Sequence, residues 1–251
     1  MRRDGKAGSR GAGKPVIDGV FDQFIADQAG RIVPRTLEKY KNVLDLLRHH
    51  LNGYGHDALT STERKVFEDH FNAEGEAHRD FCQIFGPEKI LPNLSMFLSY
   101  FMVRKVIAGQ DLLRAAGTVT KKLSRWLGEK GYVSVDVASE GAEKGAEAGR
   151  DLPRAERAAR ILYEAMQKSA VDPTELSEED FLDFDHFTIS KLRTGQLWLT
   201  NFEGGKEQAL GPIAVPSKAT ELLQEGWDVG CALGRVRGKW RLVEVGNIYP
   251  G

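Results

Sequence analysis

Two glycines and a lysine near the start of the chain have the spacing of a phosphate-binding loop. From Gly8 the sequence follows the pattern G-x-x-x-x-G-K and ends at Lys14. Such a loop needs a buried strand before it and a Ser or Thr after the lysine to hold magnesium. Here Pro15 follows the lysine, and no apolar run precedes Gly8. We therefore expect a disordered basic tail over residues 1–15, with a net charge of +4 before Pro15, and no nucleotide site.

A second group has the residue types of a zinc site. His70, Glu74, His78 and Cys82 follow one another at intervals of four. On one helix these side chains would lie along a line, whereas a tetrahedral metal site needs ligands that converge on a point. Gly75 also interrupts the helix that the spacing would need. The sequence therefore predicts an acidic surface here, and we expect neither a metal nor any other cofactor.

The clearest candidate for binding is a group of basic residues before position 131. Residues 104–130 carry a net charge of +5. Lys121, Lys122 and Arg125 are neighbours on one helical face, and Thr118 is expected at the helix N-terminus, where backbone N–H groups favour anions. This pattern indicates contact with a phosphate backbone; the alternative is an ordinary solvated helix face. The candidate residues are Arg104, Lys105, Arg114, Thr118, Lys121, Lys122 and Arg125.

A second basic group surrounds Trp240 near the C-terminus. Cations beside an aromatic ring suit a single-stranded nucleic acid, whose bases stack on the ring while the cations pair with phosphates. The alternative, which we favour for Trp240 itself and for Trp198 and Trp227, is that the indole fills the core of a small domain. The candidate residues of this hairpin are Arg235, Arg237, Lys239 and Arg241.

The elements that must position the first group are helices. Apolar residues recur at intervals of three and four up to residue 135, which predicts several amphipathic helices. Thr36 and Thr118 are expected N-caps, Thr60 and Glu63 have capping-box spacing, and Gly131 is an expected stop. Residues 16–135 should thus form a self-sufficient helical bundle. The predicted helices span 16–29, 35–51, 61–73, 93–107 and 119–131, with another helical turn or two over 109–117.

This region resembles the N-terminal core-binding domain of tyrosine recombinases, the phage integrases. The resemblance runs from Ile17 to Val133 and includes Tyr40 and Leu44, beside Thr36, and the segments "FLSYFMVRKVI" and "TVTKKLSRWLGEKGYV". It implies a bundle of four to five short helices that clamps one face of duplex DNA. Residues 52–92 form a longer connection than that family usually has.

The residues that cleave DNA in that family are missing. Cleavage there needs Arg and Lys at the scissile phosphate, a His-x-x-Arg pair and a nucleophilic Tyr. None of the six histidines has Arg three residues later. Tyr249 lies near the C-terminus without a catalytic domain before it, and a tyrosine alone cannot supply the roughly 8–23 kcal/mol that catalysis requires. We therefore expect no enzymatic activity.

Negative charge is concentrated between the two basic regions. Residues 136–185 have a net charge of −8, although the whole chain has only −1. The stretch 138–149 is low in complexity, so we expect a flexible linker over 136–150. A helix with Pro153 in its first turn and an acidic connector should follow over 151–185.

After residue 186 the apolar residues recur at intervals of two. The pattern predicts the order β-β-β-α-β-β, with turns at Thr194-Gly195 and Arg237-Gly238. A helix after the third strand is the order of an OB-type barrel, and an SH3-like barrel is the alternative. The predicted fold is thus α+β with two domains: the helical bundle and a small β-barrel over 186–251.

The function that these features indicate is non-catalytic nucleic-acid binding. Duplex DNA is the expected partner of the helices, and single-stranded nucleic acid or a protein is the expected partner of the barrel. The alternative is a protein-interaction adaptor that binds no nucleic acid. No run of apolar residues is long enough for a membrane span, and Cys82 and Cys231 lie far apart in the sequence, so we expect no disulfide and a cytoplasmic location.

Overall fold

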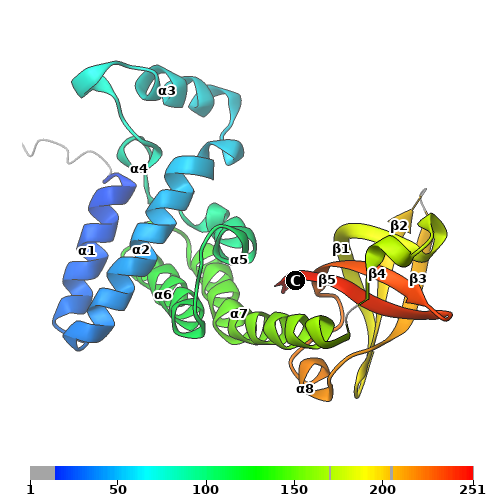
Figure 1. Ribbon diagram of the computed structural model, residues 1–251. Coiled ribbons are helices and arrows are strands. Elements are labelled where there is room, and N and C mark those ends of the chain that lie inside the picture. The colour runs from blue at the N-terminus through cyan, green and yellow to red at the C-terminus, as the bar shows by residue number, and fades with distance from the viewer. Residues whose placement is uncertain (1–14, 170, 204–205, 251) are drawn as a thin grey trace, which may run out of the picture. The chain divides into compact units, whose positions relative to one another are not determined.

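The computed structural model describes residues 15–169, 171–203 and 206–250. The fold is α+β: helices precede one five-stranded antiparallel sheet (Figure 1). The chain divides into two compact units. One contains the residues up to Asn93 together with Trp126–Ala138, and the other contains Leu94–Arg125 and Ser139–Gly251.

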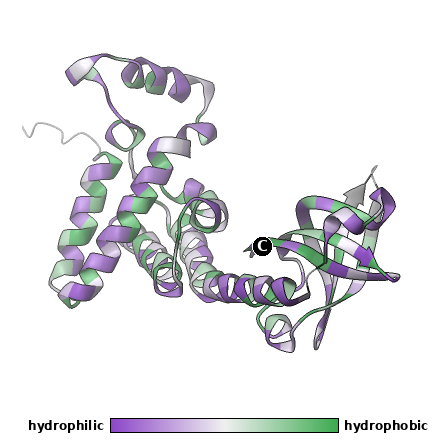
Figure 2. Cartoon of the chain, in the orientation of Figure 1, coloured by the Kyte–Doolittle hydropathy of each residue, from purple (hydrophilic) through white to green (hydrophobic). Residues whose placement is uncertain are grey.

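The first unit is built on amphipathic helices, in which polar and apolar residues alternate (Figure 2). Phe24 of α1 packs edge-on against Trp126 at 5.5 Å, and Tyr40 of α2 stacks on the same ring of Phe24. The predicted N-cap at Thr36 is wrong, because α2 begins at Pro34, whose fixed φ suits the first helical turn. The helices of this unit are α1 (Ile17–Ala29), α2 (Pro34–Tyr54), α3 (Ser61–Phe71) and α4 (Phe81–Ile84).

The predicted capping box of α3 is confirmed. The Glu63 backbone N–H donates to the Thr60 hydroxyl, and the Thr60 N–H donates to the Glu63 carboxylate. Lys89 Nζ donates to the same carboxylate at 2.7 Å, and these hydrogen bonds lower the pKa of Glu63 to about 2.

Helix α6 (Gln110–Glu129) carries the basic residues that the sequence singled out. It ends as predicted, because the N–H groups of Gly131 and Tyr132 return to carbonyls of the last turn and Gly131 has φ of +71°. It begins eight residues before Thr118, so the expected N-cap there is wrong. The Thr118 hydroxyl instead donates to the Arg114 carbonyl at 2.9 Å, inside the helix. Before α6, a π-helical turn over Met96–Phe101 leads into α5 (Met102–Arg104).

The predicted linker over 136–150 is wrong as secondary structure, since α7 spans Val135–Ser169 without a break. Its low-complexity stretch is a stripe of small residues. An added Cβ at Gly117 of α6 would lie 2.1 Å from the Gly149 nitrogen of α7, and one at Gly145 would lie 2.5 Å from the Lys121 nitrogen. The glycines thus let the two helix backbones touch. Pro153 lies inside α7 and not in its first turn.

The sheet has the strand order β3-β2-β1-β4-β5, and every neighbouring pair is antiparallel. Turns fall at Thr194-Gly195 and Arg237-Gly238 as predicted. The first strand starts at Phe181, so part of the expected acidic connector belongs to the sheet. The elements are β1 (Phe181–Arg193), β2 (Gln196–Glu203), β3 (Lys206–Ala214), α8 (Ser217–Thr220), β4 (Asp228–Val236) and β5 (Lys239–Tyr249).

The predicted closed β-barrel is not observed. Among the described residues no hydrogen-bonded ladder joins the edge strands β3 and β5, although the two strands lie near each other. The core of the sheet includes Phe187, Val229 and the buried Trp227, which confirms the prediction for that indole. Trp240 is partly buried and packs against this core, which supports the prediction for that indole. Trp198 is partly buried and is not among the residues that pack against the core, so the prediction for Trp198 is wrong.

Candidate nucleic-acid interface

The basic residues of α6 lie on its exposed side. Val119, Leu123 and Leu127 are fully buried, while the cations between them in the sequence face outward. The helix therefore separates the cations from its apolar stripe, as the spacing predicted. The exposed stripe runs through Asp111, Arg114, Thr118, Lys122, Arg125 and Glu129. Lys121 is half-buried, with its backbone against Gly145 of α7.

The structure joins one end of this stripe to arginines of α7. A hollow of about 250 Å³ lies between the two helices, with Leu222 after α8 at its side. Arg150, Arg154 and Arg157 line it at intervals of four and three, which places them on one face of α7. Arg114 lines it from α6. Four arginines from two helices therefore line one small hollow.

One carboxylate orders two of these arginines. Asp151 is nearly buried, with 9% of its side chain exposed. It accepts two hydrogen bonds from Arg150, at 3.1 and 2.9 Å, and one from Arg154 at 3.0 Å. Arg154 also lies over the Trp227 ring at 5.3 Å. Because Asp151 and Trp227 hold it in place, Arg154 is a fixed wall of the hollow, and Arg150 extends from it into solvent.

The hollow keeps an excess of positive charge. Arg114 has only a long contact to Asp111, 3.4 Å between Nη1 and Oδ1. Within the described ranges Arg157 makes no ion pair. The nearby carboxylate of Glu156 accepts a hydrogen bond from Gln110 at 3.1 Å. Asp111, Asp151 and Glu156 offset part of the charge of the four arginines, and the positive charge that remains favours an anion with several oxygen atoms, such as a phosphate.

Comparisons with protein family models, with curated proteins and with solved structures find no match for this chain. The chemistry of its surface is therefore the basis for assigning a function.

Arg104 and Lys105 lie apart from the arginine hollow in the structure. They line another cavity, of about 540 Å³, at the end of α5. Both cations lie 5.9 Å from the centre of the Tyr100 ring. Nothing in the geometry joins them to the α6 stripe, so their contact with nucleic acid stays a prediction.

The basic hairpin does not present its four cations together. Arg235 pairs across the ladder with Trp240, lies 5.6 Å from its ring and donates to Asp180 at 2.6 Å. Lys239 and Arg241 flank Trp240 on β5, so they point to the other face of the sheet. Arg237 occupies the turn with φ of 50°. The carboxylate of Asp180 already neutralises the cation nearest to the indole.

Among the described residues Trp198, rather than Trp240, has unpaired cations beside an aromatic ring, the arrangement that the sequence indicated for the hairpin around Trp240. Trp198 of β2 pairs across the ladder with Lys191 of β1. Its ring centre lies 5.3 Å from Lys191 Nζ and 5.6 Å from the Arg193 guanidinium. Leu197 and Leu199 beside it are fully buried, so the indole lies on the outer face of the sheet. A Cβ added at Gly211 would lie 2.7 Å from the ring, so only glycine fits beneath it.

The other chemical candidates are not supported. In the described part of the chain no group of His, Cys, Asp and Glu could hold a metal ion. The thiol of Cys82 is buried, and its sulfur lies 3.9 Å from the Arg48 carbonyl oxygen, so this contact directs it toward α2. Both cysteines are free, and burial raises the pKa of each thiol.

The segment with phosphate-loop spacing, which ends at Lys14, lies outside the described residues. Over the described ranges, no helix has the length and apolar character that crossing a membrane requires.

Five basic residues of the arginine hollow and of the Trp198 site were not predicted from the sequence, although a sequence pattern marks each group. Arg150, Arg154 and Arg157 form a helical stripe, but the expected end of the linker at residue 150 divided it. Lys191 and Arg193 alternate on one strand opposite Trp198. Recognising them required the register of the hairpin, which the Thr194-Gly195 turn sets.

Proposed function

We propose that this chain is a non-catalytic nucleic-acid-binding protein that holds duplex DNA by its phosphate backbone. The observation that supports this most directly is the convergence of Arg114, Arg150, Arg154 and Arg157 on one hollow. Lys122 and Arg125 continue the same exposed stripe along α6. A row of cations along a helix matches a row of phosphates better than a single small anion.

The finer assignments belong to this proposal. We propose that the helical part serves as a DNA clamp of the kind found in the core-binding domains of tyrosine recombinases. The sheet is of the OB type in this proposal, because its order β3-β2-β1-β4-β5 and the position of α8 after the third strand match that topology. The absence of a His-x-x-Arg pair from the sequence supports a role without strand cleavage.

Binding to a random-sequence duplex across a salt series tests the proposal. Affinity should fall steeply between about 50 and 200 mM salt, because bound cations release counterions from the duplex. A variant with Arg114→Gln, Arg150→Gln and Arg157→Gln should bind on the order of a thousandfold more weakly at about 50 mM salt, with a plot of log K against log salt that is shallower by about 2.7.

The matched control is Arg35→Gln, since Arg35 is exposed on α2 and makes no ion pair among the described residues. It should leave both affinity and slope unchanged. A triple variant with the parental slope would contradict the assignment of the site. No binding of the parent protein at low salt would favour the protein-interaction adaptor instead.

The sheet is proposed to add a single-strand contact at Trp198. A nucleobase can stack on the indole while Lys191 and Arg193 move from the ring to the flanking phosphates. Replacing Trp198→Ala should weaken binding of a thymidine oligonucleotide by about tenfold, the lower part of the range for one stacked base. Fluorescence anisotropy of the labelled oligonucleotide measures this.

Two comparisons make the Trp198 result specific. Trp198→Phe keeps an aromatic face and should retain most of the affinity. Phe184→Ala removes an exposed ring of the same sheet that has His186 and no cation as its ring neighbour, and it should have no effect. Equal losses for Trp198→Ala and Phe184→Ala would count against a stacking site.

A further inference from the structure

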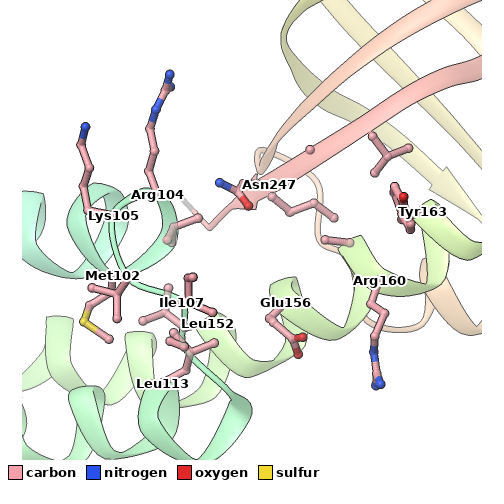
Figure 3. Close-up of a pocket in the computed structure, with 17 residues that line it drawn as sticks. Met102, Arg104, Lys105, Ile107, Leu113, Leu152, Glu156, Arg160, Tyr163 and Asn247 are labelled. Atoms are coloured by element: carbon pink, nitrogen blue, oxygen red, sulfur yellow. The ribbon is translucent and has the colours of Figure 1, made fainter.

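A second cavity lies within the C-terminal unit, separate from the arginine hollow. It has a volume of about 540 Å³ and lies between the segment 102–108, helix α7 and the end of β5 (Figure 3). This volume falls within the range of about 300–1,000 Å³ that is usual for small-molecule sites. These three segments line the cavity, which is open to solvent.

The walls of this cavity are mainly apolar. In Figure 3 the side chains of Met102, Ile107, Leu113 and Leu152 gather below the opening. Ile107 is fully exposed, although exposure of a large apolar side chain is unfavourable without a partner. Tyr163, also an exposed ring, lines the opposite side. The remaining apolar wall residues are Val103, Val106, Ala108, Ala159, Val245 and Ile248.

The rim of the cavity is positively charged. Arg104 at the end of α5 and Lys105 directly after it point away from the apolar side chains on one side, and Arg160 of α7 points away from them on the other (Figure 3). None of these three makes an ion pair with another described residue. Among the described residues Glu156 is the one carboxylate that lines the cavity; its hydrogen bond from the neutral Gln110 amide leaves its charge in place, so it offsets one of the three cations. The cavity therefore offers an apolar interior below cations that lack a carboxylate partner.

We propose that this cavity binds an anionic amphiphile of the fatty-acid class, a carboxylate on an unbranched apolar chain. The chain would cover Ile107 and the apolar walls, and transfer of each methylene from water would contribute favourably to binding. The carboxylate would pair with Arg104 or Arg160 at the rim, where a flexible side chain can reach it. This site shares Arg104 and Lys105 with the residues predicted from the sequence to contact nucleic acid, but it shares neither Arg114 nor the α7 arginines of the arginine hollow.

Titration of the full chain with dodecanoate tests this proposal. Calorimetry below the micellar concentration should show saturable binding to one site, at least about tenfold tighter than binding of dodecylammonium, which has the same chain and the opposite charge. Dodecanol should fall between them. Absence of saturable binding, or equal affinity for the two charged ligands, would overturn the proposal.

Variants locate the ligand in the cavity. Ala159→Phe should fill the cavity and abolish binding, and Arg160→Gln should reduce the preference for dodecanoate over dodecylammonium. Ile107→Ser changes a fully exposed side chain, so it should weaken binding without affecting folding. Val33→Ser, which changes another exposed apolar residue, is the matched control and should bind normally. Unchanged affinity in both Ala159→Phe and Ile107→Ser would exclude this cavity as the site.

Discussion

Replacing Gly117→Ala should lower the free energy of unfolding by about 3 kcal/mol, at the upper end of the usual cost of overpacking. The added methyl carbon would lie 2.1 Å from the Gly149 nitrogen, 2.3 Å from its Cα and 2.6 Å from the Gly145 carbonyl oxygen. These are all backbone atoms of α7, so no side chain can rotate away. The two helices must separate to accept the methyl group.

Urea unfolding followed by circular dichroism measures this loss, with Gly19→Ala as the matched control. Gly19 also lies inside a helix, but a Cβ there meets no atom within 4 Å. That substitution should raise the free energy of unfolding by about 0.5–1 kcal/mol, because alanine loses less backbone entropy in a helix. If Gly117→Ala behaves like Gly19→Ala, then α6 and α7 do not touch at the glycines.

The same contact matters for the proposed interface. Arg114 lies one turn before Gly117, and Arg150 follows Gly149 directly. The close approach of the two glycines is therefore what brings the arginines of α6 and α7 to one hollow. Variants that fold but separate the helices should also weaken duplex binding.

Acidification should reduce the stability of the chain between pH 6.5 and 4 through His50. This residue is buried in α2, stacks on Tyr54 at 5.6 Å, and burial lowers its pKa from 6.5 to about 4 despite a hydrogen bond to the Asn93 backbone. Below pH 6.5 the unfolded chain binds a proton at this position while the native chain does not. The unfolding free energy should therefore fall by about 2 kcal/mol by about pH 5, and by about 3 kcal/mol by pH 4.

Urea midpoints at several pH values test this effect. In His50→Gln the fall between pH 6.5 and 5 should be nearly absent, whatever the stability of the variant at neutral pH. His70→Gln, at an exposed position of α3, should keep the parental fall. The pKa of Glu63 is lowered from 4.5 to about 2, so the stability that its carboxylate contributes is lost only below about pH 4.5. Glu63 therefore does not contribute to the fall between pH 6.5 and 5. A parental slope in His50→Gln would show that another group is responsible.

The sequence predicted much of the local structure because local rules dominate there. Helix α1 and the end of α6 follow from apolar spacing and from Gly131. The capping box at Thr60 follows from side chains that accept hydrogen bonds from the free N–H groups of the first helical turn. The turn at Thr194-Gly195 follows from the ability of glycine to adopt a positive φ. The exposed position of Lys122 and Arg125 follows from the same helical period.

The sequence by itself thus determined α1, α3, the end of α6, the strands and their order, and the segregation of charge along α6. Only the tertiary structure decided which charges meet. The small residues over 138–149 lack an apolar period, so they predicted a linker. In the structure the glycines of this stretch allow close contact with the backbone of α6, and no local sequence pattern indicates such a contact. The register of β1 and β2, rather than composition, placed Lys191 and Arg193 over Trp198, whereas Arg235 over Trp240 is paired with Asp180. Contacts between residues distant in the sequence depend on geometry in three dimensions, and the arginine hollow is such a contact.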